Sequence, residues 1–285
     1  MNAKRMIDSA KRLEMPPVSE EMFLEAVDQV VAANKDWIPP FESGGALYLR
    51  PYLFATGPVI GVKPSDEYQF RLFGTPVGSY FKNGVKPITI CVSDYDRAAP
   101  HGTGNIKAGL NYAMSLYPYI LAHQKGFDEN MYLDAATRTY VEETGGANFL
   151  FVTKDGKLVT PKSDSILPSI TRRSLVTIAE HLGYTVEHRP VKFTELKDFA
   201  EAGLCGTAAV ICPVGKVVGN GETIEFPSGM QDMGPVLTIL SNTLRGFQLG
   251  TVEAPEKGWI REIKESSCPA QQSEVRFFCG GPFCD

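Results

Sequence analysis

The chain has 285 residues, of which 43% are hydrophobic and 21% charged, so it is long enough for one or two globular domains with a sizeable core. Its 28 basic and 33 acidic residues give a net charge of −5, which excludes a general electrostatic grip on nucleic acid or an anionic membrane. No apolar run reaches the roughly 18–20 residues that span a bilayer, and residues 1–14 lack the apolar core of a signal peptide. We therefore expect a cytoplasmic protein without nucleic-acid or membrane partners.

The first 77 residues predict a small domain with one helix and two strands. A serine followed at once by two acidic residues is typical of a helix N-terminus, and apolar pairs then recur every four residues. A tryptophan and a Pro-Pro pair end this pattern, and two β-rich runs follow with a Gly- and Pro-rich connection between them. The predicted elements are a helix from Ser19 to just before Trp37 and strands over 46–55 and 68–77.

A larger second domain is predicted over 85–263, with 78–84 as the interdomain linker. Its strands and helices do not alternate strictly, which favours an α+β fold over a doubly wound sheet. Asp155-Gly156 between two β-rich runs indicates a hairpin. The predicted strands cover 88–94, 148–153, 157–160 and 207–218, and the predicted helices cover 110–125, 169–182, 194–203 and 236–247.

The six cysteines show no disulfide framework. Cys268, Cys279 and Cys284 lie close together in sequence, but no histidine is near them to complete a metal site. We expect no bound metal, and a disordered tail over 264–285.

Conventional catalytic motifs are absent, and Gly102-x-Gly104 lacks the third glycine of a dinucleotide fingerprint. Lys107 stands among small and apolar residues, where lost solvation can turn an amine into a nucleophile for Schiff-base chemistry. A lysine at a helix start with its ammonium group in water fits the same pattern, so composition leaves both interpretations open.

Three further segments contain residues that could belong to an active site or a phosphate-binding site. Only one carboxylate of the Glu142-Glu143 pair can enter a site, because neighbouring side chains on a strand point to opposite faces. A solvated pair at a strand end is the alternative. The backbone N–H groups of the helix that begins after Ser169, and those of the turn 205–208, could hold a phosphate group.

In order along the chain, these segments resemble the branched-chain amino-acid aminotransferases, which are fold-type IV enzymes that use pyridoxal phosphate. The resemblance runs in register from about Asn2 to Ile263. Its pieces are Leu47-Tyr48-Leu49-Arg50-Pro51, Gly78-Ser79-Tyr80-Phe81, Gly102 through Tyr112, Glu143 through Asn148, Ile166 through Arg172, and Cys205-Gly206-Thr207-Ala208-Ala209. It implies an α+β, two-domain fold of the fold-type IV kind.

The resemblance assigns the cofactor site residue by residue. Lys107 matches the lysine that forms the internal aldimine and shuttles the proton, and Glu143 matches the carboxylate that pairs with the pyridine nitrogen. Tyr112 matches the tyrosine that binds the phenolic oxygen of pyridoxal 5'-phosphate. Leu167 matches a residue that packs on the ring, and the phosphate cup matches Ile170, Thr171 and Thr207.

The resemblance also implies the substrates. Thr207 and Ala208 match the turn that receives the substrate carboxylate, and Arg50 matches the arginine that reaches the distal carboxylate of glutamate. The apolar pocket walls match Tyr48, Ile60, Val62 and Tyr80, of which Ile60 and Val62 come from the neighbouring subunit of a homodimer. The implied reaction transfers the amino group of leucine, isoleucine or valine to 2-oxoglutarate, so the partners are small amino and 2-oxo acids.

Three departures from the family pattern qualify this interpretation. The family has further upstream residues with an arginine that grips the cofactor phosphate, and we expect that arginine to fall before Asn2 and the small domain to be truncated. A Cys-x-x-Cys pair of some members matches Ala209 and Cys212, so no such redox switch is expected. Residues 264–285 do not follow the family pattern. The alternatives are a catalytically impaired, truncated homologue, a D-amino-acid aminotransferase and an aminodeoxychorismate lyase.

Overall fold

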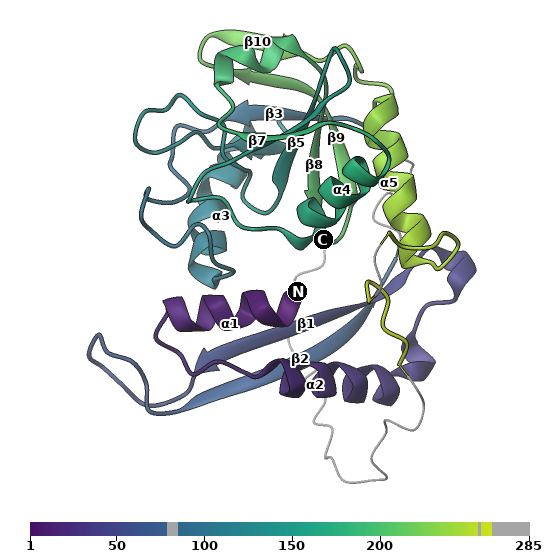
Figure 1. Cartoon of the computed structure of the whole chain (residues 1–285). Helices are drawn as coiled ribbons and strands as arrows, with labels where there is room; N and C mark the ends of the chain where they lie inside the picture. Colours follow the sequence, from purple (N-terminus) through teal and green to yellow (C-terminus); the bar gives the residue numbers. More distant parts are fainter. Residues whose placement is uncertain (79–84, 256–257, 264–285) are drawn as a thin grey trace.

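The computed structural model describes residues 1–78, 85–255 and 258–263, and its elements form two lobes (Figure 1). The small lobe contains α1 (Asn2–Arg12), α2 (Glu20–Ala33), the 3-10 turns η1 (Lys35–Trp37) and η2 (Phe41–Ser43), β1 (Ala46–Ala55) and β2 (Tyr68–Val77). The large lobe contains β3 (Ile88–Val92), α3 (Gly109–Gln124), β4 (Glu129–Met131), β5 (Asn148–Thr153), β6 (Leu158–Pro161), α4 (Ile170–His181), β7 (Val186–Arg189), η3 (Phe193–Asp198), β8 (Phe199–Gly206), β9 (Val210–Gly219), β10 (Glu222–Glu225) and α5 (Pro235–Gln248).

The small lobe is a two-stranded antiparallel sheet packed against helices. The Ser19 hydroxyl accepts a hydrogen bond from the backbone N–H of Met22 at 3.1 Å, which confirms the predicted cap of α2. Phe23 of α2 stacks with Phe70 of β2, whose register pairs it with Leu53 of β1. Both predicted strands are confirmed over their full lengths.

Helix α1 was not predicted from the sequence. Its buried residues are small, Ala3, Ser9 and Ala10, so the sequence shows no broad apolar stripe. Small side chains suit its position, because α1 lies between the sheet of the small lobe and the underside of the large lobe (Figure 1).

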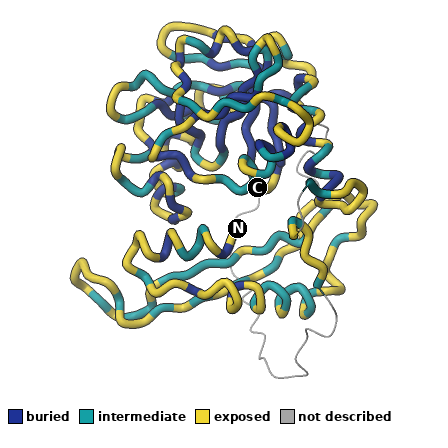
Figure 2. Tube along the Cα trace, viewed as in Figure 1, coloured by how far each residue is buried: buried dark blue, intermediate teal, exposed yellow. Residues whose placement is uncertain are grey.

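The large lobe is built on an eight-stranded mixed sheet in the order β4-β3-β9-β8-β5-β6-β7, with β10 paired to β9. The pairs β3–β4, β3–β9 and β6–β7 are parallel and the others antiparallel, in agreement with the α+β expectation. Helices α4 and α5 cover one face through Leu175, Ile178, Leu237 and Leu240. Buried residues are concentrated in these central strands (Figure 2). No helix in the described ranges is long and apolar enough to cross a bilayer.

The predicted helix over 194–203 is wrong. Residues Phe193–Asp198 form a 3-10 helix, and Phe199–Gly206 is strand β8, which pairs with both β5 and β9. Two neighbouring strands complete the backbone hydrogen bonds of β8 and override its local helix signal. The predicted strand over 207–218 begins later, at Val210, because residues 207–209 form the turn before β9. The other predicted helices and strands are present with ends displaced by a few residues.

A C-terminal segment, residues 258–263, connects the two lobes. The ring of Trp259 packs edge-on against Phe247 of α5, with 6.0 Å between ring centroids. Two residues later, Arg261 forms an ion pair with Asp28 of α2. This segment therefore contacts both lobes along one side of the molecule (Figure 1). The tail predicted over 264–285 and most of the predicted linker lie outside the described residues.

Glu129 of β4 makes stability depend on pH. Burial raises the pKa of this carboxyl from 4.5 to about 7, so the folded state holds its proton more tightly than the unfolded chain. The stabilising contribution is thus complete below about pH 4.5 and is lost as the pH rises through 7. Glu129→Gln should raise the free energy of unfolding by about 1–3 kcal/mol at pH 8 and change it little at pH 4. Urea titrations test this, with the exposed Glu222→Gln as the matched control. Equal effects at both pH values would contradict it.

Candidate active site

Lys107 lies in the segment between β3 and α3, on a turn that one buried side chain organises. The Asn111 amide donates to the carbonyls of Thr103 (2.8 Å) and Ile106 (3.0 Å), and its carbonyl oxygen accepts from the Thr103 hydroxyl at 3.0 Å. The backbone N–H of Lys107 donates to the Ser9 hydroxyl of α1 at 2.9 Å. Two elements of different lobes therefore fix the backbone from which the Lys107 side chain extends.

The Lys107 amine meets Tyr112 one turn into α3. Its Nζ donates to the Tyr112 hydroxyl at 2.5 Å and lies 4.8 Å from the centre of the ring. The Lys107 side chain is exposed, so the amine is accessible to small molecules. The structure thus brings Lys107 into contact with Tyr112, another of the residues that the resemblance assigns to the cofactor.

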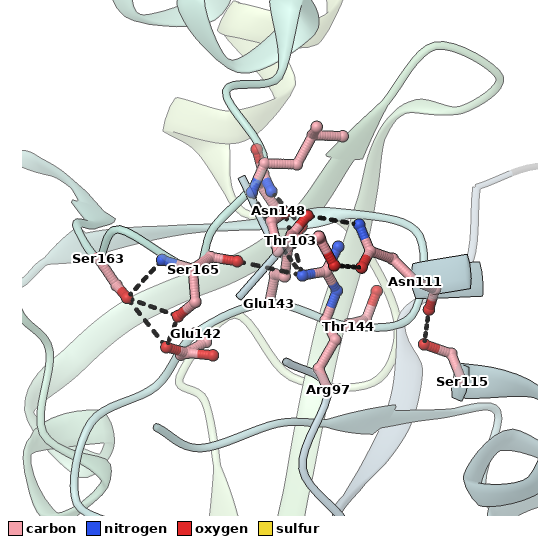
Figure 3. Close-up of polar contacts among 12 residues, drawn as sticks. Arg97, Thr103, Asn111, Ser115, Glu142, Glu143, Thr144, Asn148, Ser163 and Ser165 are labelled. Atoms are coloured by element: carbon pink, nitrogen blue, oxygen red, sulfur yellow. Dashed lines mark hydrogen bonds and ion pairs between the residues drawn. The ribbon is translucent and has the colours of Figure 1, made fainter. Parts of the chain in front are cut away.

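Glu143 is the buried carboxyl group of the site, with 2% of its surface exposed. Its Oε1 accepts a hydrogen bond from the Leu167 N–H at 2.7 Å and lies 3.0 Å from Nη1 of Arg97 (Figure 3). Its Oε2 accepts from the Asn148 amide at 2.7 Å. The alternative of a solvated carboxylate pair is wrong, because Glu142 is also buried, on the opposite side of the chain.

Burial raises the pKa of Glu143 to about 7, although Arg97, the Leu167 N–H and Arg172 all act to lower it. The Glu143 carboxyl therefore changes charge near neutral pH. A positively charged partner at its Oε2 would favour the carboxylate form, as Arg97 does at Oε1.

Arg97 joins three segments of the site. Its Nη1 donates to the carbonyls of Gly104 (3.3 Å) and Ser165 (3.1 Å) and pairs with Glu143. With 4% of its surface exposed, it is a buried cation that links the turn before Lys107 to the anion of the site. Neither Arg97 nor Asn148 was singled out from the sequence, because no local motif marks an arginine that pairs with a residue 46 positions away.

The start of α4 lies beside this centre. The Ser169 hydroxyl accepts from the Arg172 N–H at 3.2 Å, and the N–H groups of Ile170 and Thr171 at the helix N-terminus have no intrahelical acceptor. Arg5 of α1 approaches the same place, where its Nη1 donates to the Pro168 carbonyl at 3.4 Å. The structure thus brings a cation to the predicted phosphate cup, where none was expected from the sequence.

Thr207 and Ala208 are exposed in the turn between β8 and β9. The end of β8 lies beside Glu143's partner, because Cys205 pairs with Asn148 across the sheet. The turn closes with Val210 at φ 62°, a left-handed conformation that a β-branched residue rarely adopts. Such strain is concentrated at functional sites, where the backbone must point its N–H groups in a set direction.

The predicted substrate residues of the small lobe lie on one face of β1. Tyr48 and Arg50 line an open depression of about 420 Å³ together with Tyr52, Phe73 and Thr75. The Arg50 guanidinium stacks over the Tyr48 ring at 5.2 Å.

The other predicted pocket residues do not line this depression. Ile60 and Val62 are fully exposed in the loop between β1 and β2, which projects away from the large lobe (Figure 1). Tyr80 lies outside the described residues.

Gly104 is required by close packing. A Cβ atom at this position would lie 2.1 Å from the Ser165 carbonyl oxygen and 2.9 Å from the Ala98 Cβ. Gly104→Ala should therefore separate the two turns that Arg97 joins and lower the free energy of unfolding by about 1–3 kcal/mol. Thermal unfolding tests this, with Gly109→Ala, where a Cβ meets nothing within 4 Å, as the control. Equal Tm changes in the two variants would contradict the packing argument.

The chain resembles known proteins over most of its length. The sequence profile of the family described as Amino-transferase class IV matches residues 1–217. The branched-chain-amino-acid aminotransferases of Haemophilus influenzae and Helicobacter pylori are 50% and 46% identical over 92% of this chain, which covers 78% and 76% of their lengths.

Solved structures agree with these relatives. The crystal structure of the Escherichia coli branched-chain amino acid aminotransferase has a TM-score of 0.78 at 30% identity, over 92% of this chain and 83% of that one. The Thermobaculum terrenum enzyme, described as its PLP-bound holo-form, has a TM-score of 0.75 at 28% identity, over 88% and 78%. The fold is that of the fold-type IV enzymes. The chain therefore belongs to the class IV aminotransferases and, within them, to the branched-chain-amino-acid aminotransferase family.

Proposed function

We propose that this protein is a pyridoxal-phosphate-dependent transaminase that moves the amino group of leucine, isoleucine or valine to 2-oxoglutarate. The observation that carries the proposal is the connected site: an accessible Lys107 amine on the Tyr112 hydroxyl, joined through Gly104 and Arg97 to the buried Glu143. An amine, a phenol and a buried anion are the groups that pyridoxal phosphate needs around its ring.

The site has matching acceptors and donors for the cofactor. Glu143 Oε2 has one hydrogen-bond donor, Asn148, and retains a lone pair for a protonated ring nitrogen, while the Asn148 Oδ1 beside it is buried without a partner in the described chain. At the other end, the Ile170 and Thr171 N–H groups and the Arg5 guanidinium would bind the phosphate, together with Thr207. Leu167, which is 6% exposed, would pack on the ring.

When bound, pyridoxal phosphate supplies an electron sink for the carbanion that forms when Cα of the amino acid loses its proton. Lys107 would hold the cofactor covalently before the substrate arrives, and its released amine would then take the Cα proton as general base and give it up again as general acid. Tyr112 keeps the amine in place through its hydroxyl. Arg97 and a positively charged ring both favour the carboxylate form of Glu143, which would accept a hydrogen bond from the protonated ring nitrogen so that the ring can accept charge.

The two substrates share one pocket in this proposal. Backbone N–H groups of the Thr207-Ala208 turn bind the α-carboxylate, and the apolar surface around Tyr48 receives a branched side chain. Arg50 extends from the same face of β1 and would pair with the distal carboxylate of glutamate or 2-oxoglutarate. The Arg50 guanidinium lies over the Tyr48 ring, so the same pocket offers a cation to a carboxylate and an aromatic surface to a branched aliphatic side chain.

We also propose a homodimer in which Ile60 and Val62 complete the neighbour's pocket. Both side chains are fully exposed in the described chain, as expected for residues that another copy covers. Helix α3 has more uncovered apolar surface, formed by Leu110, Met114, Leu116, Tyr117, Tyr119 and Ile120.

Light scattering tests the dimer. The measured mass should be twice 31.2 kDa, and Leu116→Glu with Ile120→Glu should reduce it to the mass of one chain. The exposed-surface variant Lys154→Glu is the control. A monomeric wild type that transaminates leucine at full rate would rule the dimer out.

The visible absorption spectrum with added pyridoxal phosphate tests the activity itself. A Schiff-base band should appear and then bleach when L-leucine is added. Bleaching by D-alanine but not L-leucine would favour a D-amino-acid aminotransferase, and pyruvate release from aminodeoxychorismate would favour the lyase. A folded protein without any bound band would show a catalytically silent homologue.

A further inference from the structure

Glu142 is a buried carboxyl group that the proposed chemistry does not use. It has 3% of its surface exposed and forms no ion pair within the described ranges. Its Oε1 instead accepts hydrogen bonds from the hydroxyls of Ser163, at 2.9 Å, and Ser165. Figure 3 shows Glu142 and these serines on one side, with Glu143 and Arg97 on the other. Burying a carboxyl group is unfavourable unless it forms hydrogen bonds, and here the two serine hydroxyls provide them.

The three side chains close a small ring. The two serine hydroxyls lie 2.8 Å apart, and the Ser165 N–H donates to the Ser163 hydroxyl at 3.2 Å. Both serines belong to residues 163–167, the middle of the connection between β6 and α4, which we call the 163–167 loop. The ring therefore fixes the backbone of that loop. Glu142 is the only member of the ring that lies outside the loop, so it attaches this side of the loop to the rest of the lobe.

The opposite side of the same loop contacts the proposed catalytic centre. The Ser165 carbonyl accepts from Arg97 at 3.1 Å, and the Leu167 N–H donates to Glu143 at 2.7 Å. The loop is therefore held between two adjacent glutamates that point in opposite directions.

We propose that Glu142 is a positioning residue: by holding Ser163 and Ser165, it keeps the Leu167 N–H directed at Glu143 and the Ser165 carbonyl directed at Arg97. The positioning of the loop by Glu142 follows from the contacts alone, whereas the consequence of that positioning for catalysis rests on the proposed function. The role requires an acceptor oxygen at position 142 and does not require a charge.

Two variants separate the acceptor from the charge. Glu142→Leu removes the acceptor, frees the loop and weakens the hydrogen bond from the Leu167 N–H, a bond that lowers the pKa of Glu143. It also removes the negative charge of Glu142, which acts in the opposite direction but is the smaller of the two effects, so the pKa should rise. Glu142→Gln keeps an acceptor oxygen and removes only a negative charge that raises this pKa, so the pKa should fall slightly. The other charges that act on Glu143 are Arg97 and Arg172, and neither variant alters them.

The first experiment uses the whole chain without cofactor. Hydrogen–deuterium exchange should be at least tenfold faster at the Leu167 amide in Glu142→Leu and within threefold of wild type in Glu142→Gln. A ¹³C-carboxyl titration of Glu143 should move to higher pH in the leucine variant and slightly lower in the glutamine variant. Thr160→Val is the control for lost stability. It removes a buried hydroxyl that donates to the Phe149 carbonyl at 3.1 Å, elsewhere in the sheet.

The proposal fails if Glu142→Leu leaves both the Leu167 exchange and the Glu143 titration unchanged, or if Glu142→Gln behaves like Glu142→Leu. Should Glu142→Leu not fold, Ser163→Ala with Ser165→Ala opens the same ring from the loop side and must give the same fast exchange. With pyridoxal phosphate and leucine, the acid limb of kcat/KM should also move to higher pH in Glu142→Leu. If the wild type lacks transaminase activity, the proposed function fails, while the two cofactor-free measurements still decide the role of Glu142.

Discussion

We expect Lys107→Arg to lower the rate of leucine transamination by roughly 10²–10⁴-fold. Arginine keeps a positive charge beside the Tyr112 hydroxyl, but a guanidinium does not lose its proton in proteins and so cannot act as nucleophile or base. The loss should therefore appear in the chemical step and leave the fold intact. Single-turnover absorption kinetics with leucine measures it.

Lys125→Arg is the matched control, since it makes the same chemical change just after α3, outside the site. It should leave the rate within about twofold of wild type. If Lys107→Arg retains more than a tenth of the wild-type rate, a different group moves the proton and the assignment of Lys107 is wrong.

The second large effect concerns Arg97. Arg97→Met should lower the free energy of unfolding by about 3–5 kcal/mol at pH 8, because it leaves the buried Glu143 carboxylate without its cation. The pKa of Glu143 is already about 7 with Arg97 present and rises further without it. Below that pH the carboxyl group binds a proton in the folded state, so the loss of stability should be smaller at pH 5. Urea unfolding of the cofactor-free protein at both pH values measures the difference.

Arg97→Met with Glu143→Gln separates the charge from the packing. The double variant removes both ions and should recover much of the stability lost at pH 8, yet it should remain inactive because the anion of the site is gone. A loss that is equal at pH 5 and pH 8, and that the double variant does not recover, would show that the bonds to Gly104 and Ser165 matter more than the ion pair.

Local patterns predicted most elements of the fold. The Ser19 cap, the β-rich runs of β1 and β2 and the Asp155-Gly156 turn each depend on neighbours within a few residues. Strand β8 was mistaken for a helix because its sheet partners, β5 and β9, are distant in sequence. Helix α1 was missed because its buried face consists of small residues that resemble those of a solvated segment.

The features of the candidate site also divide into those that local sequence could predict and those that depend on the folded sheet. The family resemblance assigned Lys107, Tyr112 and Glu143 to one site, and the opposed directions of Glu142 and Glu143 followed from the period of a strand. Their burial and their partners could not be predicted, since Arg97 and the 163–167 loop reach the site only after the sheet forms. The cation at the phosphate cup was missed for the same reason, because Arg5 is brought there by α1.

The segment that contacts both lobes gives the molecule an internal optical reporter. The chain has two tryptophans, and Trp37 is 66% exposed, so its emission should resemble that of the free side chain in water. Trp259 is half-buried on Phe247, two residues from the ion pair that links this segment to α2. A movement of the small lobe that stretches this segment should change the surroundings of the indole ring. Blue-shifted fluorescence from Trp259 should thus report in real time, without a label, whether the two lobes move against each other.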